Sequence, residues 1–413
     1  MKKCVAAFSL VILLFLSGCE KGFSDYTSDL NRFFEEKVLS EIKSYDINNG
    51  EIVNITPEDE VTGNAQLSSY NKLSDNQKKL YSIIHKAVED MELRLIDVTK
   101  CSNSDIFSDA IAAHRALMFD RPDIFWMPKV LSFVSVEGKK NKYICFKEYS
   151  DKQDTVGFYG MTLSQKLEMS SKLIDAEKTV TSKLNQFDND FDKELFIHDY
   201  LCEHIEYDNS AASDLKNANV NSTTVYGALV EGKAICEGYS KAMQYLCLKS
   251  GIPCSIVCGE HENTPHMWNI INPGDGLYYL DVTFDDSSDT SVLHSYFNLT
   301  KAEISEDHSF AKEFLPEASY DVSDNFNFFC GNYKNTQLNF FEKNSAYITD
   351  DYRDAIIFIT SQYDKGKTSA ELKNLTSLTN REVFDALSLK LRGAVNLKKS
   401  YGYEGKNIII LVW

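Results

Sequence analysis

Cys236, His266 and Asp281 are the residues of this chain whose types and order could carry out chemistry together. A thiol nucleophile needs a base beside it, and the base needs a carboxylate that orients its ring. Such a triad attacks a carbonyl carbon, forms a thioester and releases an amine. Taken singly, each residue also has an ordinary structural interpretation, since buried free cysteines are common. Their order and surroundings favour acyl transfer over that interpretation.

The residues after Cys236 predict a helix that begins at or next to this cysteine. One apolar face repeats every three or four residues, at Ala242, Met243, Leu246 and Cys247. Gly251 and Pro253 mark the expected end of the helix. A helix N-terminus favours an anion, such as a thiolate. Gly232 and Gly238 allow a tight turn and a close backbone approach around the cysteine.

Three short strands are expected after this helix, over residues 255–259, 265–272 and 277–284. The turn at 273–276, rich in Pro and Gly, joins the last two strands into a hairpin. His266 and Asp281 flank that hairpin on adjacent strands, so their side chains can be cross-strand neighbours. The start of the helix can then pack Cys236 against His266.

At these positions the chain resembles the transglutaminase-like superfamily. The matching segments, which extend from about residue 190 to about residue 310, are 197–201, 205–208, 226–240, 251–253, 266–269, 279–286 and 296–299. The resemblance implies that Cys236 is the nucleophile, His266 the general base and acid, and Asp281 the orienting carboxylate. It also implies an α+β fold with a papain-like core, in which the helix that bears the cysteine packs on an antiparallel sheet.

Several residues near the triad have more than one interpretation. Trp268 lies on the same strand face as His266, where it could shield the imidazole, line the acyl site or simply pack in the core. Tyr226 or the amide of Asn219 could donate to an oxyanion beside the backbone N–H of Cys236. Structural roles are expected for the other histidines and aspartates of this region, namely His198, His204, His308, Asp285 and Asp286.

A zinc site is a competing interpretation of the cysteines and histidines that follow the helix. Cys254, Cys258, His261 and His266 lie close in sequence. On one strand, however, residues four apart are separated by about 13 Å, too far for both thiols to bind one tetrahedral ion. Zinc is compatible with this segment only if it forms a loop. We therefore expect neither a metal nor an organic cofactor, and no loop matches an EF-hand.

The N-terminus predicts export and lipid attachment. Lys2 and Lys3 precede an apolar stretch, 5–16, that is too short to span a bilayer. The following Leu16–Cys19 segment resembles a bacterial lipobox, which implies cleavage before Cys19 and a diacylglycerol on its thiol. An ordinary secretory signal with an incidental cysteine is the alternative. The lipobox interpretation places the mature protein on the outer face of a bacterial cell membrane, anchored rather than spanning.

Composition narrows the possible partners. The formal net charge of −18 argues against binding nucleic acid or clinging to an anionic lipid surface. Of ten cysteines, Cys4 would leave with the signal, Cys19 would carry lipid and Cys236 must stay free as a nucleophile. Seven would remain, and an odd number argues against a full disulfide framework.

The flanking regions carry patterns of their own. Residues 74–77 form a capping box that opens a helix whose apolar stripe continues to Leu95. Strands are expected at 131–136, 142–146, 355–360 and 407–413, and helices at 161–187 and from 379 to 391. The predicted domains are a signal peptide (1–18), a lipidated tether (19–35), a mixed helical and hairpin domain (36–189), the catalytic domain (190–312) and a small α/β domain (320–413).

Together these patterns predict a membrane-anchored extracytoplasmic enzyme that acts on peptide or carboxamide bonds of cell-envelope proteins or peptides. Hydrolysis by water gives a protease or amidase, and attack by an amine gives a transglutaminase. We favour hydrolysis because water is abundant and no acceptor-lysine site is visible. The alternative is a catalytically inactive binding or scaffold lipoprotein that keeps the fold. A solute-binding lipoprotein has no support, because the chain shows no obvious pair of α/β lobes.

Overall fold

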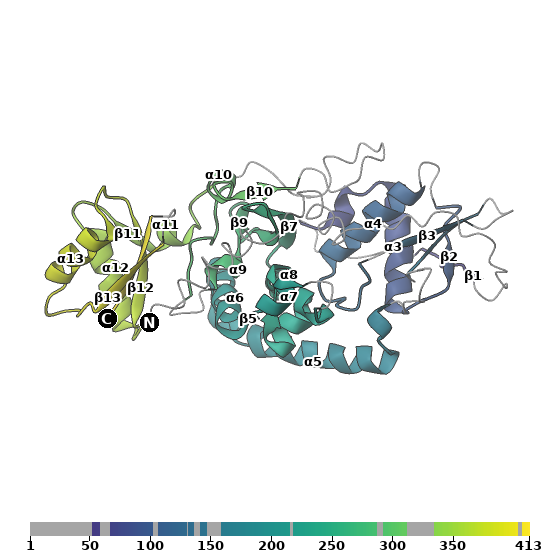
Figure 1. The fold of residues 1–413 in the computed structure, drawn as a ribbon, viewed down its shortest axis with the longest axis horizontal. Helices are drawn as coiled ribbons and strands as arrows, with labels where there is room; N and C mark the ends of the chain where they lie inside the picture. The colour runs from purple at the N-terminus through teal and green to yellow at the C-terminus, as the bar shows by residue number, and fades with distance from the viewer. Residues whose placement is uncertain are drawn as a thin grey trace, which may run out of the picture.

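The computed structural model describes residues 52–57, 67–101, 106–129, 131–135, 141–146, 158–214, 218–286, 292–311, 334–403 and 407–413. The predicted signal peptide, Cys19 and the tether lie outside these residues. The described chain is an α+β structure in which three four-stranded sheets follow one another along the longest axis of the molecule (Figure 1). Among the described helices, none is both long and apolar enough to cross a membrane.

The N-terminal unit packs two helices beside a small mixed sheet. Ser74 and Gln77 form the predicted capping box, in which each side chain binds the other residue's backbone N–H. The sheet has the strand order β1-β2-β4-β3, with only the β1–β2 pair parallel. Its elements are β1 (Ile52–Val53), α3 (Asp75–Glu89), β2 (Leu95–Asp97), α4 (Ile106–Asp120), β3 (Ser132–Ser135) and β4 (Lys142–Cys145).

A long helix, α5 (Leu163–Thr181), leads from this unit along the helices of the next unit (Figure 1). The unit predicted to be catalytic then places α8 against an antiparallel sheet of order β10-β7-β8-β9. Its elements are α6 (Asp190–His204), β5 (Glu206–Tyr207), α7 (Asn209–Ser213), β6 (Lys233–Ala234), α8 (Cys236–Lys249), β7 (Cys254–His261), β8 (Thr264–Ile271), β9 (Tyr278–Leu280), α9 (Val282–Asp285), α10 (Lys301–Ile304) and β10 (His308–Phe310). This is the predicted helix-on-sheet arrangement.

The C-terminal unit is a second small mixed sheet, of order β11-β12-β14-β13. The predicted capping box at Thr379 and Glu382 opens α13, and the predicted last strand is β14. Its elements are α11 (Phe340–Asn344), β11 (Tyr347–Ile348), α12 (Arg353–Asp364), β12 (Ser369–Asn374), α13 (Asn380–Lys390), β13 (Lys399–Tyr403) and β14 (Ile408–Val412).

One predicted strand is wrong. Residues 355–360 lie inside α12, where Ala355, Phe358 and Ile359 are the buried positions. Their spacing of three and four residues is that of one helix face. In the sequence, however, a short apolar run is compatible with a helix or a strand. The packing of α12 against β11 and β12 decides between the two.

Three predicted element ends also need correction. The helix that starts at Asp75 stops at Glu89, since Met91 adopts a left-handed backbone (φ 51°) and Leu95 already belongs to β2. The helix expected to reach residue 187 ends at Thr181 and is followed by a single 3-10 turn. The strand expected over 277–284 ends at Leu280, because the next residue caps a helical turn.

Candidate active site

Cys236 is the first residue of α8, as the sequence predicts. The chain enters the helix through Gly232, which adopts a left-handed backbone (φ 68°). A Cβ atom on Gly238 would lie 2.6 Å from the Cβ of Ala234 and 2.9 Å from the carbonyl oxygen of Ser222, so only glycine allows this close approach. The backbone N–H at the first position of a helix has no intrahelical acceptor. The thiol therefore lies at the positive end of the helix dipole, beside a donor that can face a bound carbonyl.

His266 lies between the thiol and a carboxylate. Its Nε2 is 2.5 Å from Oδ2 of Asp281, and its side chain is also hydrogen-bonded to that of Cys236. Because Asp281 occupies Nε2, the nitrogen left for the thiol is Nδ1. The pairing of β8 with β9 brings Leu280 opposite Asn269, which places Asp281 at the strand end next to His266. The three residues proposed from the sequence are thus brought together.

Asp281 is held by more than the imidazole. Its Oδ1 accepts from the backbone N–H of Thr283 and of Phe284 at 3.0 and 3.3 Å, which makes it the N-cap of α9. Its Oδ2 also contacts a second imidazole, because Nε2 of His308 lies 3.0 Å away. A carboxylate fixed at both oxygens has little freedom to turn, so it fixes the orientation of His266.

The charges of the pair reinforce each other. Burial opposes the charged imidazolium, but Asp281 and Cys236 raise the pKa of His266 to about 10. Burial likewise opposes the carboxylate, but His266 and His308 hold the pKa of Asp281 well below its usual range. At neutral pH the arrangement therefore favours an imidazolium on an ionised Asp281, which is the electrostatic setting that stabilises a neighbouring thiolate.

Aromatic rings enclose the imidazole. Trp268 is fully buried and lies nearly parallel to His266, with ring centroids 6.0 Å apart and an interplanar angle of 20°. It also makes an edge contact with His308 at 5.0 Å. His266 itself is 8% exposed and Cys236 is 9% exposed. Trp268 therefore shields the ring from water, one of the roles considered for it from the sequence.

The N-terminal unit reaches the site through a lysine. Glu237, which follows the cysteine, is buried between Nζ of Lys129 at 2.6 Å and Nζ of Lys241 at 2.7 Å. Burial opposes its charge, but the two lysines hold the pKa of Glu237 below its usual value. Both lysines also line a small hollow of about 10 Å³ between the N-terminal unit and α8. The first unit thus contacts the residue that follows the thiol, through an ion pair that no sequence pattern indicated.

The structure separates the candidates for an oxyanion donor. Tyr226 packs against Phe125, with ring centroids 5.2 Å apart. Asn219 caps a 3-10 turn and its Nδ2 donates to Glu231 at 3.4 Å. The tyrosine whose ionisation responds to the thiol is instead Tyr207, since burial and then the charge of Cys236 raise its pKa. Tyr207 is therefore a further hydroxyl to consider, and its position in the predicted opening segment 205–208 was the only signal for it.

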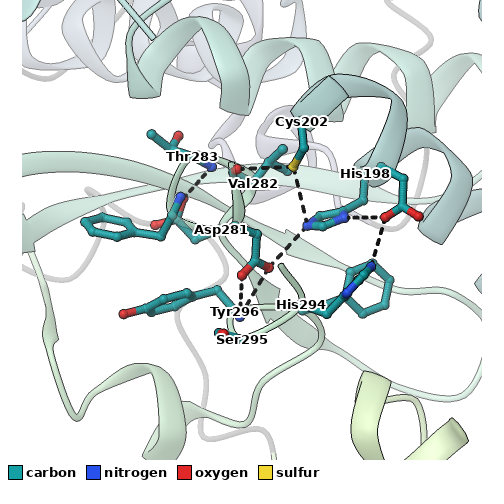
Figure 2. A network of polar contacts seen from close by, with 12 residues as sticks. His198, Cys202, Asp281, Val282, Thr283, His294, Ser295 and Tyr296 are labelled. Atoms are coloured by element: carbon teal, nitrogen blue, oxygen red, sulfur yellow. Dashed lines mark hydrogen bonds and ion pairs between the residues drawn. The ribbon is translucent and has the colours of Figure 1, made fainter. Parts of the chain in front are cut away.

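A second cysteine–histidine–carboxylate group lies in the same unit (Figure 2). The sulfur of Cys202 is 4.0 Å from Nε2 of His198, and that nitrogen is 3.2 Å from Oδ2 of Asp285. His198 Nδ1 is 3.0 Å from Oδ1 of Asp199. Burial raises the pKa of Cys202 to about 11 although His198 opposes the shift. Sequence patterns predicted structural roles for His198 and Asp285 only, and did not bring the four residues together.

The cysteines and histidines weighed for zinc do not form a tetrahedral set. Cys254 and Cys258 both lie on β7, as the argument against that site required. All seven cysteines within the described residues are free. Two other groups of the described chain have ligand atoms close enough to hold an ion: His266 with Asp281 and His308, and His198 with Asp199 and His294.

One family model matches the part of the chain that holds the triad. Residues 178–287 match the model of the transglutaminase-like superfamily, and this part of the chain is a domain of that superfamily. One solved structure described as a TGase is 15% identical, with 40% of this chain and 46% of that one covered and a TM-score of 0.27. Another, named "Putative Cysteine Protease" from Cytophaga hutchinsonii, is 14% identical, covers 37% and 61%, and has a TM-score of 0.23. The chain thus spans less than two thirds of either protein. No relative was found among curated proteins.

Proposed function

We propose that this protein is a thiol acyl-transfer enzyme that uses Cys236, His266 and Asp281. The observation that carries the proposal is the position of His266, whose Nε2 is bound by Asp281 while its ring is hydrogen-bonded to a cysteine at a helix N-terminus. The membership of residues 178–287 in the transglutaminase-like superfamily supports a thiol enzyme.

In the proposed reaction the proton of the Cys236 thiol already resides on Nδ1 of His266, so the resting pair is a thiolate beside an imidazolium. The thiolate attacks the carbonyl carbon of a peptide or carboxamide bond and forms a tetrahedral oxyanion, beside the backbone N–H of Cys236. Collapse of this intermediate breaks the C–N bond, and the imidazolium gives its proton to the leaving amine. Asp281 keeps the ring oriented and compensates its charge throughout.

The thioester is then resolved by water or by a second amine. Water gives a protease or amidase, and an amine gives a transglutaminase. We favour hydrolysis because water is abundant and the sequence shows no acceptor-lysine site. If Cys19 is lipidated, the enzyme is anchored on the extracytoplasmic face of a membrane, where envelope proteins and peptides are the available substrates.

The inactive scaffold is the competing function. It predicts a cysteine and a histidine too far apart for a hydrogen bond, and the hydrogen-bonded pair argues against it. A thiol that is only 9% exposed favours neither possibility, because substrate binding commonly opens such sites.

The test is the alkylation rate of each cysteine. The soluble form, residues 20–413, is treated with iodoacetamide from pH 4 to pH 9, and each peptide is quantified by mass spectrometry. Cys236 should react fastest, because among the cysteines that the structure describes it alone lies at a helix N-terminus beside a paired histidine. The His266→Gln variant should lose this advantage, and trials with envelope peptides and amine acceptors would then follow.

His204→Gln is the matched control, since His204 is exposed and its Nδ1 lies 2.8 Å from the carbonyl oxygen of Tyr200, away from the triad. It should leave the labelling of Cys236 unchanged. If wild-type Cys236 reacts no faster than the buried Cys247 or Cys258, the thiol is not activated and the scaffold becomes the better description.

A further inference from the structure

His198, Asp199 and His294 converge on one point away from the Cys236 thiol. Oδ1 of Asp199 is 3.0 Å from Nδ1 of His198 and 3.0 Å from Nε2 of His294. His198 and Asp199 belong to α6, whereas His294 lies in the segment after α9. Figure 2 shows the rings of His198 and His294 one beneath the other, with the Cys202 thiol on the far side of His198. Two ring nitrogens and one carboxylate oxygen thus share a small space.

The far nitrogen of each ring is bound by a separate buried carboxylate. Nε2 of His198 is 3.2 Å from Oδ2 of Asp285, and Nδ1 of His294 is 3.0 Å from Oε2 of Glu371. Histidines that ligate metals almost always donate their other N–H to such a partner, which fixes the tautomer and turns the free lone pair toward the ion. Both rings have this arrangement, and in both cases the nitrogen that remains is the one facing Asp199.

The supporting carboxylates are themselves fixed. Both oxygens of Asp285 accept from the backbone N–H of Tyr296, at 3.0 and 3.2 Å. Glu371 accepts from the backbone N–H of His294 at 2.8 Å and from the hydroxyl of Ser295 at 3.1 Å. The ring of His294 stacks on Phe340, with centroids 3.8 Å apart and an interplanar angle of 7°. The donors are therefore held in place before any ion binds.

The spacing suits a small divalent ion. Ligands about 2.0–2.1 Å from a tetrahedral Zn²⁺ lie about 3.3 Å from one another, a few tenths of an ångström more than the two 3.0 Å separations seen here. Charge suits it as well, because the two imidazoles face three carboxylates, those of Asp199, Asp285 and Glu371. An ion of charge +2 would compensate that excess in a low-dielectric setting.

Exposure distinguishes this cluster from the other possible metal group. The side chain of Asp199 is 31% exposed, which leaves a route for an ion and room for a water ligand. In the other group, His266, Asp281 and His308 are all buried, and the thiol of Cys236 takes the remaining contact of His266. The ligand atoms of that group are therefore already used by contacts within the triad.

We propose that His198, Asp199 and His294 bind one divalent transition-metal ion, best matched by Zn²⁺, at a site separate from the triad. The ion joins α6 to the 292–298 segment, and Glu371 of β12 extends the link to the C-terminal sheet. Its role is to hold the C-terminal unit on the catalytic unit, and the site is open enough to keep one water ligand. The proposal does not depend on the proposed acyl transfer.

The test titrates Zn²⁺ into the metal-free full-length protein against a chromogenic chelator, with bound metal counted by elemental analysis. The wild type should bind one tight ion per chain. Asp199→Asn should weaken binding by about 100-fold or more, and Glu371→Gln by about 10- to 100-fold, since it removes an outer-shell partner. His204→Gln and Glu203→Gln, exposed neighbours on α6, should bind as the wild type does.

Three further measurements keep the result decisive. Cys236→Ser and His266→Gln should still bind one ion, and loss of binding in either would move the ion to the triad and overturn the proposal. Co²⁺ should show no thiolate-to-metal charge-transfer band, because the donors are two nitrogens and one oxygen.

Circular dichroism of the metal-free variants reports folding, and if Asp199→Asn is unfolded the more conservative Glu371→Gln decides. Unchanged affinity in Glu371→Gln, or no Zn²⁺ binding by the folded wild type, would also overturn the proposal.

Discussion

Two cysteine–histidine–carboxylate groups lie in one unit of this protein, and they differ in how the histidine nitrogens are used. In the first, Asp281 takes Nε2 of His266 and the ring keeps a nitrogen for Cys236. In the second, Asp285 takes Nε2 and Asp199 takes Nδ1 of His198, which leaves no free nitrogen for a proton from Cys202.

The helices sharpen this difference. Cys236 opens α8, at the positive end of the helix dipole. Cys202 is in the last turn of α6, at the negative end, where its sulfur donates to the carbonyl oxygen of Val282 at 3.6 Å. The same three residue types thus favour a nucleophile in one place and a structural or ion-binding cluster in the other. Side-chain identity alone does not make a triad.

The largest expected effect separates the two cysteines. Cys236→Ser should lower kcat/KM for a cleaved peptide by at least about 10⁴-fold, because the nucleophile is lost. Cys202→Ser should stay within about threefold, since its thiol faces no available base. Steady-state assays on both purified variants give the answer. Comparable losses in the two would mean that the groups are not functionally different.

The next effect concerns the carboxylates. Asp281→Asn should reduce kcat by about 10³- to 10⁴-fold, as the amide cannot compensate the imidazolium. The pKa of His266 is raised to about 10, so the imidazolium persists below pH 10 and activity should fall as pH rises through that value. Without the Asp281 charge, this alkaline limb should move toward pH 6.5.

Asp285→Asn is the matched control for that experiment, because it changes the carboxylate of the second group. Its kcat should remain within about threefold and its alkaline limb should stay in place. An Asp281→Asn profile that keeps the wild-type limb would show that Asp281 does not set the charge of His266.

A stability measurement tests the protonation of a buried carboxyl group, that of Glu194, next to the second group. Glu194, one helical turn before His198, is fully buried, and burial raises its pKa to about 8. The folded state therefore keeps this proton up to pH 8, whereas the unfolded chain releases it near pH 4.5, so wild-type stability declines between these values. Glu194→Gln should remove that decline and raise the free energy of unfolding at pH 8 by about 4 kcal/mol.

The measurement is thermal unfolding of wild type and Glu194→Gln at pH 4.5 and pH 8. The variant should melt roughly 10 °C higher at pH 8 only, which corresponds to about 4 kcal/mol in a domain of this size. Glu203→Gln, on the exposed side of α6, is the control. Equal melting temperatures of the variant and the wild type at pH 8 would contradict a protonated Glu194.

The smallest effect concerns the second histidine on Asp281. His308→Gln removes the ring that lies 3.0 Å from Oδ2, which should loosen the carboxylate and lower kcat by about tenfold with KM unchanged. A purely structural role would change the melting temperature and leave the pH profile of kcat in place. We expect the alkaline limb to shift instead, because Oδ2 gains freedom to leave His266.

Much of the candidate site could be predicted because it depends on local patterns. The apolar spacing after Cys236 and the glycines around it define where α8 begins, and the hairpin around residue 273 brings His266 to Asp281. Each of these signals lies within one element or between neighbouring ones. The capping boxes at Ser74 and Thr379 were predictable for the same reason.

Only the tertiary structure decided which side chains meet over long distances. His308 reaches Asp281 because β10 pairs with β7, and Lys129 reaches Glu237 because two units pack together. Residues 355–360 form a helix because of their packing, and a run this short does not by itself distinguish a helix from a strand. Periodicity reports the face that a residue occupies, whereas the choice of partner depends on how whole elements pack, and for this reason the second histidine cluster is visible only in the folded chain.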